Sequence, residues 1–406
     1  MRISEPALPP LKTVQVALGK TTEALASELA HPSAEVPDWS PFEWRIARAS
    51  AVLHGVSSLL SSHLTWPGPT DWLEFLAEQR MHTQARHVRL DALLRLIDER
   101  ARDLSIAVVA LKGASLHQMG LYAAGERPMA DLDLFVSAAD VESMAGILEA
   151  IGFRQTTVSW KHRVFESDEV QPPAIFGEHS GNGIKIDLHM QIREILPRQP
   201  VDVSDLILPS EPRFGLNPYR SQASLMAHLL LHAAGCITLR TLRLVQLHDM
   251  ALLSMRMSST DWAQLVSLGE RRSLWWAFSP LTLVARYYGT IPAEVLASAA
   301  ADCGWSLRRS SRNRLLWQVS FSDLRRRAFP GIEWSQSVGE VLAYATERAV
   351  LAAQVLTRAN HSGHVAGRVD GIPTPSALQP PARWMGLRPA RPAPLLAVRN
   401  ALAQAR

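Results

Sequence analysis

The sequence predicts an α+β fold, in which a small mixed β-sheet with helices on one side lies between N-terminal helices and a mostly α-helical C-terminal region. Three observations lead to this prediction. Residues 43–104 repeat apolar side chains at helical spacing, residues 105–195 contain short apolar or alternating runs, and helical patterns return over 221–358. Helices, then strands running together, then helices again are typical of an α+β protein.

The N-terminal part divides into two segments. Residues 1–42 contain several prolines and only weak periodicity, which predicts a loosely ordered arm. Residues 43–104 should form an N-terminal helical layer, because their apolar residues recur three and four positions apart. We expect one amphipathic helix over 43–64 and a second over 71–103, broken at most once.

The pattern changes at residue 105, where a central core over 105–195 begins. Short runs that are rich in β-branched residues or strictly alternating predict strands, and the segments between them have helical spacing. Gly152 should end the second helix, because glycine favours the left-handed conformation that follows many helices. The expected strands are 106–111, 132–136, 153–158, 161–166 and 184–190, and the expected helices are 114–121 and 138–151.

The C-terminal half is expected to be helical after a connection. Residues 196–220 are proline-rich and predict a connecting loop, and an α-helical domain over 221–358 follows. Its expected helices are 221–235, 239–254, 260–270, 273–288, 292–301, 312–326 and 337–357. Residues 359–406 are rich in Pro and Arg and have no period, which predicts a disordered tail with one short helix over 395–404.

Composition narrows the class of protein. The net charge is +4, but only five residues are lysine, so arginine carries nearly all of the positive charge, and this bias is no clear signal for DNA binding. The two cysteines, Cys236 and Cys303, are too far apart for a CxxC motif and too few for a disulfide framework. No signal peptide is visible, and the most apolar run, 225–237, is too short to span a bilayer. These features predict a cytoplasmic protein with no membrane partner.

Two carboxylates lie in the alternating run ADLDLFV. Asp131 and Asp133 should point to one face of the strand while Leu132 and Leu134 point into the core. Acids at positions i and i+2 lie about 7 Å apart along a strand, so both can reach a shared pair of divalent cations. Taken alone, such a pair is more often a solvated strand edge or a turn.

A third carboxylate comes from the run IKIDLHM. Here the apolar residues alternate with Lys185, Asp187 and His189, so the strand should present an acid flanked by a cation and an imidazole. An edge strand with one solvent-exposed face and no functional role has the same pattern. Two strands that both present acids beside cations, within one short core, favour a functional site.

A turn precedes the first acidic strand. Glycine at position 113 would let the backbone come close to a ligand, and a helix N-terminus offers free N–H groups to a phosphate. Lys112 adds a positive charge and Ser115 a hydroxyl. By itself the turn also fits a simple strand-to-helix corner. Its position one element before the acidic strand favours a role in binding phosphate.

Together these residues resemble a known family. The LKG turn at Lys112-Gly113, an R-x-x-x-D-x-D strand from Arg127 to Asp133, Gly152-Phe153 and a later D-x-H strand are similar to the motifs of an uncharacterised bacterial nucleotidyltransferase-like family of the DNA polymerase β superfamily. The resemblance extends over residues 45–290.

The resemblance implies a metal-dependent nucleotidyltransferase, which transfers a nucleoside monophosphate from a nucleoside triphosphate to an acceptor hydroxyl or phosphate. It implies Mg²⁺ (or Mn²⁺) bound by the catalytic residues Asp131, Asp133 and Asp187 in a two-metal mechanism. His189 would orient Asp187 by a hydrogen bond. The implied nucleotide-binding residues are Lys112, Gly113, Ser115, Arg127 and Lys185. The acceptor stays open among a small molecule, a sugar, a peptide, a protein and an RNA.

The chain departs from the wider superfamily at the turn. The usual Gly-Gly or Gly-Ser pair lies closer to the two acids than Gly113, which precedes Asp131 by 18 residues. Lys112 or Arg127 would therefore do part of the work of that turn. Two alternatives stay open: a D-x-D glycosyltransferase with a single Mn²⁺, and a catalytically inactive nucleotidyltransferase-like binding module. The glycosyltransferase needs no acid on a later strand, so Asp187 argues against it.

Polar residues in the helical domain have structural interpretations. His228 and His232 share one helix face, but they lack a third ligand or a H-E-x-x-H motif, so packed histidines are expected rather than a metal site. Asp249 is expected to be a buried anchor between helices.

Overall fold

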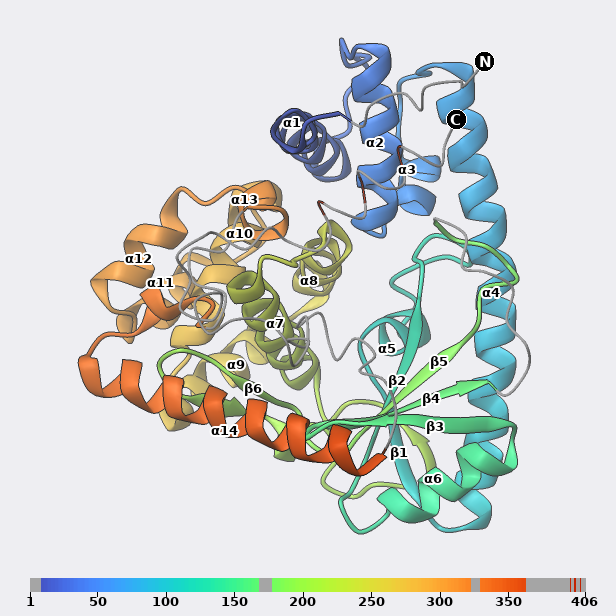
Figure 1. Ribbon diagram of the computed structural model, residues 1–406, viewed down its shortest axis with the longest axis vertical. Helices are drawn as coiled ribbons and strands as arrows, with labels where there is room; N and C mark the ends of the chain where they lie inside the picture. Colours follow the sequence, from blue (N-terminus) through green and yellow to red (C-terminus); the bar gives the residue numbers. More distant parts are fainter. Residues whose placement is uncertain are drawn as a thin grey trace.

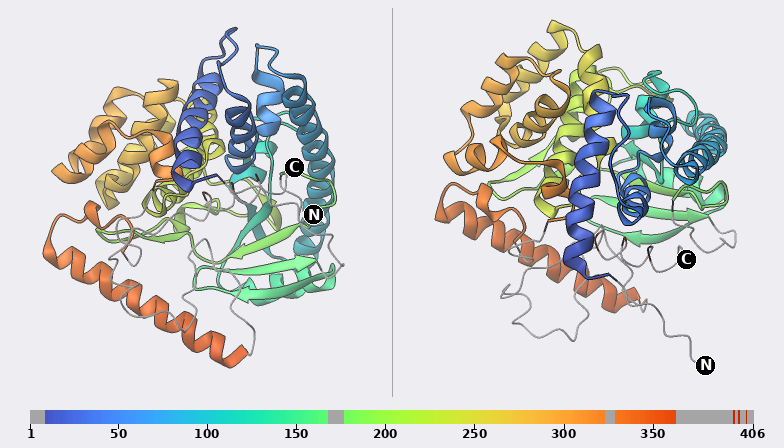
Figure 2. Two further views of the ribbon diagram at one scale, coloured as in Figure 1. Left: turned by 45° about the horizontal axis from the view of Figure 1, so that its top comes forward. Right: turned by 90° about the horizontal axis from the view of Figure 1, so that it is seen from above.

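The computed structural model describes residues 9–167, 177–322 and 329–362, together with Leu395, Val398 and Leu402. It has the expected α+β architecture. Figure 1 shows the sheet flanked by the long helix α4 on one side of the view and by the C-terminal helices on the other, with α1, α2 and α3 above. The two turned views in Figure 2 show the same three parts.

The N-terminal layer contains one helix more than expected. The loose arm predicted for 1–42 is wrong from residue 11 on, because α1 buries Val14, Leu18 and Leu25. Its pattern is weak because Thr21 and Thr22 lie on the buried face, where their hydroxyls find partners: Thr21 donates to the carbonyl of Ala17. The helices of the layer are α1 (Leu11–Ala30), α2 (Pro41–Leu53), α3 (Ser57–His63) and α4 (Thr70–Asp103).

The helix predicted over 43–64 is two helices. Gly55 adopts φ +65°, a left-handed conformation that ends the first helix and lets the chain turn into α3. The first helix also begins earlier than expected, since Ser40 and Glu43 form a capping box in front of it. The second predicted helix, over 71–103, is confirmed as the unbroken α4.

His54, at the end of α2, connects the N-terminal layer to the C-terminal helices. Its Nδ1 accepts a hydrogen bond from the backbone N–H of Leu244 (2.9 Å), so its Nε2–H donates to the hydroxyl of Thr22 (3.1 Å). Both ring nitrogens are thus used by the neutral imidazole. Complete burial lowers the pKa of His54 from 6.5 to about 3, and the charge of Arg243 lowers it further.

We expect His54 to make the protein acid-sensitive. Because folding lowers this pKa, the unfolded chain binds the proton more tightly, and the stability that neutral His54 contributes is present above pH 6.5 and is lost as the pH falls toward 3. The free energy of unfolding should fall by about 1.4 kcal/mol per pH unit from this group alone. Urea unfolding of the parent and of His54→Gln between pH 7 and pH 4.5 measures the difference, and parallel pH profiles would contradict the assignment.

The sheet is mixed and has six strands, as the predicted class requires. Its order is β3-β4-β5-β2-β1-β8, with β2 parallel to β5, β1 parallel to β8, and the other neighbours antiparallel. The strands are β1 (Ala107–Ala110), β2 (Asp131–Val136), β3 (Phe153–Val158), β4 (His162–Ser167), β5 (Lys185–His189) and β8 (Gly215–Asn217). The core helices are α5 (Lys112–Gln118) and α6 (Val141–Ala150), and Gly152 has φ +90° just after α6.

The segment 196–220 is more than the predicted connecting loop. It supplies the edge strand β8 to the sheet, and its β7 (Pro200–Asp202) pairs with β6 (Arg193–Ile195) in a separate two-stranded sheet, followed by the 3₁₀ turn η1 (Ser204–Leu206). These strands have three residues each. Runs this short carry no periodicity that a sequence pattern can reveal.

Both faces of the sheet meet helices, so the predicted one-sided arrangement is wrong. One face, including Leu132, Leu134 and Ile186, forms a core with α4 and α6. On the opposite face Val109 and Phe135 belong to the larger core of the C-terminal helices. The rest of that opposite face carries the acids, and this is where the candidate site lies.

The C-terminal region is helical, as predicted, with changed boundaries. The stretch predicted over 312–326 separates into the end of α12 and a short α13, and residues 323–328 lie outside the described part. The helices are α7 (Gln222–Leu239), α8 (Leu244–Arg256), α9 (Ser259–Arg272), α10 (Phe278–Tyr288), α11 (Ala293–Ala301), α12 (Trp305–Arg312), α13 (Leu316–Ser320) and α14 (Val338–Ser362), with 3₁₀ turns η2 (Trp275–Ala277) and η3 (Ile332–Trp334). By length and composition α7 could cross a membrane, but 78% of it is buried within the protein, as in a core helix.

Little of the predicted tail over 359–406 lies in the described part. The helix α14 continues to Ser362. Leu395, Val398 and Leu402 are helical and buried in a small core with Val14 and Leu18 of α1, where a short helix was expected. The remaining tail residues, and with them its predicted disorder, lie outside the described residues.

Candidate functional site

The register between β2 and β5 brings the predicted acids together. The parallel pairing places Asp133 opposite Asp187 and Asp131 opposite Lys185. Partners in a register point to the same face, so both carboxylates stand on the face opposite Leu132 and Leu134. The alternation expected from the sequence is therefore present in both strands.

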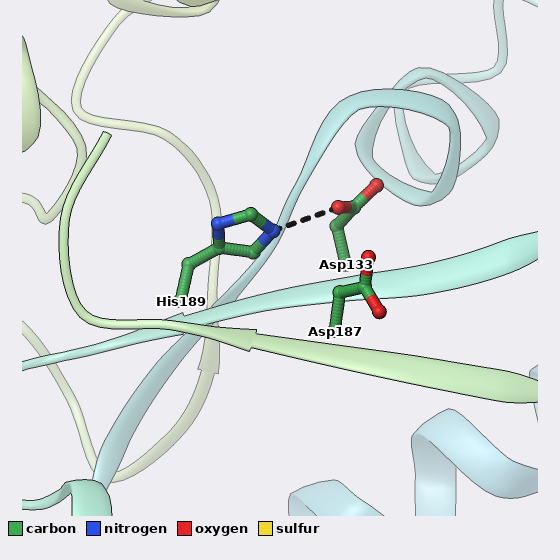
Figure 3. A group of neighbouring side chains, drawn as sticks. All are labelled: Asp133, Asp187 and His189. Carbon is green, nitrogen blue, oxygen red and sulfur yellow. Dashed lines mark hydrogen bonds and ion pairs between the residues drawn. The ribbon is translucent and has the colours of Figure 1, made fainter. Parts of the chain in front are cut away.

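Asp133, Asp187 and His189 form a compact group. One ligand atom of each lies within 4.8 Å of the others, and all three side chains are buried. Figure 3 shows the three rising together from neighbouring strands, with the imidazole turned toward Asp133. Two carboxylates and an imidazole at this spacing could hold a divalent cation. Asp131 is partly exposed and is not one of this group.

Asp133 is the charged member of the group. Its Oδ1 lies 3.0 Å from the ammonium of Lys112 and 2.8 Å from Nε2 of His189. Burial alone would raise the pKa of Asp133, but Lys112 and the hydrogen bond from His189 outweigh burial and hold this pKa well below its usual value. His189 was expected to orient Asp187. Its hydrogen bond goes to Asp133 instead.

Asp187 has the opposite behaviour. Burial raises its pKa, the negative charge of Asp133 raises it further, and the result is about 7 despite Lys185, whose ammonium lies 3.1 Å from Oδ1. The two adjacent carboxylates therefore do not both ionise readily without an additional cation. This is the electrostatic condition expected of a carboxylate pair that binds a metal.

His162 also belongs to the site, although the sequence did not single it out. It begins β4, pairs in register with His189, and its Nε2 lies 3.9 Å from Oδ2 of Asp187. The rings of the two histidines are 4.9 Å apart. Its signal was a histidine at the start of a predicted strand, but only the order β4-β5-β2 shows that it lies beside the acids.

Lys112 reaches Asp133 from a constrained backbone. It has φ +48°, a left-handed conformation that is uncommon for residues other than glycine. Its backbone N–H donates to the hydroxyl of Tyr219 (3.3 Å), and this hydroxyl shares a hydrogen bond with Nδ1 of His228 (2.7 Å). Tyr219 and His228 are both buried, so His228 is packed, as expected, and it supports the turn that holds Lys112.

Gly113 lies against the guanidinium of Arg127. The left-handed residue of the turn is Lys112, whereas a Cβ on Gly113 would lie 2.1 Å from Nη1 of Arg127. Arg127 is buried and donates two hydrogen bonds to Asp249, from Nε (2.8 Å) and from Nη2 (2.7 Å). Tyr122 donates a third to the same carboxylate (2.6 Å). Gly113 thus makes room for a buried ion pair. Asp249 is a buried anchor, as expected, but it joins α8 to the segment between α5 and β2 and not to another helix.

The remaining predicted residues lie around the acids at different depths. Ser115 is buried in the first turn of α5, and Lys185 keeps 37% of its side chain exposed beside Asp187. Lys161 pairs with Glu194 (3.3 Å), and its charge lowers the pKa of His189, after the larger effects of burial and Lys112. Of only five lysines in the chain, three thus lie at this face of the sheet.

Fold and site together define the class of protein. The α+β core, with a mixed sheet that presents acids on neighbouring parallel strands, fits a nucleotidyltransferase core. A family model described as "Uncharacterised nucleotidyltransferase" matches residues 38–289, more than half of the chain, and the chain belongs to that family. Searches of curated proteins and of solved structures found no match.

Proposed function

We propose that the protein transfers a nucleoside monophosphate from a nucleoside triphosphate to an acceptor, with divalent cations bound by Asp133 and Asp187. The observation that carries the proposal is the register of β2 and β5, which sets these two buried carboxylates side by side on one face. Membership of a nucleotidyltransferase family supports the nucleotide as substrate. The acceptor classes left open by the sequence, and a cytoplasmic location, are part of the same proposal.

The residues at the site fit a divalent cation. Carboxylate oxygens suit Mg²⁺ and Mn²⁺, and the imidazole of His189 shifts the preference toward Mn²⁺. The raised pKa of Asp187 marks a carboxylate that needs another positive charge beside it. When bound, the ions would neutralise phosphate charge and lower the pKa of the acceptor hydroxyl. We assign Asp131, at the partly exposed start of β2, to a second ion that arrives with the triphosphate.

The protein's own cations have distinct tasks in this proposal. Lys185, partly exposed beside Asp187, is placed to bind phosphate oxygens. Lys112 stabilises ionised Asp133 and would turn toward the nucleotide when a metal takes its place. Gly113 and Ser115 complete the same turn. Arg127 donates two hydrogen bonds to Asp249 and a third to the carbonyl of Pro128, so its contacts favour a supporting role over the predicted contact with phosphate.

The two alternative functions, a glycosyltransferase and an inactive binding module, do not require Asp187. A single-metal glycosyltransferase would use Asp131 and Asp133 and would leave Asp187 dispensable. An inactive binding module would need none of the acids. The burial of Asp187 beside Asp133, with the cost of holding two acids together, favours a nucleotidyltransferase site that binds metal.

We expect nucleotide binding to depend on metal. Isothermal titration of the protein with each nucleoside triphosphate, in Mn²⁺, in Mg²⁺ and in EDTA, should show an affinity at least about tenfold weaker in EDTA, or about 1.4 kcal/mol. The reason is that the ions bridge phosphate oxygens to the acids. Asp133→Asn should bind weakly in all three buffers. Equal affinity of the parent with and without EDTA would contradict the proposal.

A further inference from the structure

Arg86, in the middle of α4, joins two segments that are far apart in the sequence. The residue is 3% exposed. Through Nη2 it donates to the carbonyls of Met129 (3.1 Å) and Ala130 (3.5 Å), and through Nη1 to those of Asn182 (2.5 Å) and Gly183 (3.4 Å). One side chain therefore holds the backbone just before two different strands.

Those strands are the two that carry the acids. β2 begins at Asp131, directly after Ala130, and β5 begins at Lys185, two residues after Gly183. Because β2 and β5 are parallel, both start at the same edge of the sheet, and Asp131 pairs with Lys185 as the first residues in register. Arg86 sits immediately in front of that first pair.

Register at this edge decides whether the site exists. Successive side chains of a strand point to opposite faces, so a shift of β5 by one residue would place Ile186 or Leu188 opposite Asp133 and turn Asp187 into the core. The acids themselves oppose the correct register, because it brings two carboxylates together in a buried place. The apolar face of β5 favours this register, since Ile186 and Leu188 pack in the core, and an interaction that holds the starts of both strands would add to it.

We propose that Arg86 is a positioning residue of the acidic site, which sets the register of β2 against β5 and thereby the separation of Asp133 and Asp187. This inference rests on the proposed function. The five donor hydrogens of a planar guanidinium suit such a bridge, whereas an ammonium on a flexible stem does not have this fork geometry. Glu178, whose carboxylate lies 3.3 Å from Nε, offsets the buried charge.

The neighbouring Arg89 provides a matched control. It lies on the same helix and donates to the carbonyls of Ser180 and Asn182, so it also holds the segment before β5. Its hydrogen bonds are exposed, and the structure records none from it to the segment before β2. A change at Arg89 therefore affects only the segment before β5. A change at Arg86 affects the segments before both strands, so the two variants distinguish these effects.

The experiment compares Arg86→Lys, Arg86→Gln and Arg89→Lys in the full chain. Calorimetric titration measures Mn²⁺ affinity, hydrogen exchange measures protection of the amides of Leu132–Leu134 and Ile186–Leu188, and a melting curve controls for folding. We expect both Arg86 variants to lose about 10- to 100-fold in Mn²⁺ affinity and to exchange these amides faster. Arg89→Lys should match the parent in both.

The outcomes distinguish the inference from the function on which it rests. A lower melting temperature for Arg86→Lys with parental Mn²⁺ affinity and parental exchange would overturn the positioning role, because it would leave Arg86 only a structural one. Equal losses in Arg89→Lys would overturn it as well. A parent that binds no Mn²⁺ would contradict the proposed function. In that case amide hydrogen exchange in β2 and β5 would by itself test the positioning role: faster exchange in the Arg86 variants would support it, and parental exchange would overturn it.

Discussion

Asp187→Asn should lose turnover on the order of 10³-fold, or about 4 kcal/mol in the barrier, while the protein stays folded. The amide keeps the shape of the carboxylate but supplies no charge to a metal. Nucleotide affinity should fall much less, since Asp131 and Asp133 remain. The measurement is pyrophosphate release from a panel of nucleoside triphosphates and acceptor classes in Mn²⁺, with a melting curve for each variant.

The stability of the same variant gives an independent check. Because folding raises the pKa of Asp187 from 3.8 to about 7, the folded state binds this proton more tightly, and its contribution to stability is present at low pH and lost as the pH rises through about 7. Without metal, Asp187→Asn should therefore be more stable than the parent at pH 8. Asp133→Asn should be less stable, because it leaves the buried ammonium of Lys112 without its partner.

The Asp187→Asn prediction has a control variant and an outcome that would contradict it. Glu149→Gln removes an acid from the exposed side of α6, on the other face of the sheet, and should change neither turnover nor melting temperature. If Asp187→Asn turned over like the parent while Asp133→Asn was inactive, the single-metal glycosyltransferase would be the better assignment.

Gly113→Ala should destabilise the protein by about 3–5 kcal/mol, the cost of disrupting a buried ion pair. The added methyl group would lie 2.1 Å from Nη1 and 2.8 Å from Cζ of Arg127, so the guanidinium must move. It has little freedom to do so, because Asp249 holds it by two hydrogen bonds in a buried place. Chemical denaturation measures the loss.

Gly146→Ala is the matched substitution for this prediction. Gly146 lies within α6, and a Cβ there would meet no atom within 4 Å, so alanine should stabilise the helix by up to about 1 kcal/mol. A Gly113→Ala protein as stable as the parent would mean that the Arg127–Asp249 pair contributes little, and that Gly113 serves another purpose.

The sequence by itself determined which side chains share a face. Alternation in ADLDLFV and IKIDLHM placed Asp133 and Asp187 opposite the apolar residues of their own strands, because side-chain direction is a local property of an extended backbone. The long helix α4 and the end of α6 at Gly152 were predictable for the same reason. Segments with weak or short patterns, such as α1 and β8, were not.

Only the tertiary structure decided how those faces meet. The register that pairs Asp133 with Asp187, the contact of His189 with Asp133 instead of Asp187, and the position of His162 all depend on which strands are neighbours. The space that Gly113 leaves for Arg127, and the bridge from Arg86 to two strands, join residues with no shared local pattern. Such contacts arise from packing and hydrogen bonding between distant segments, and periodicity within one segment carries no information about its partner.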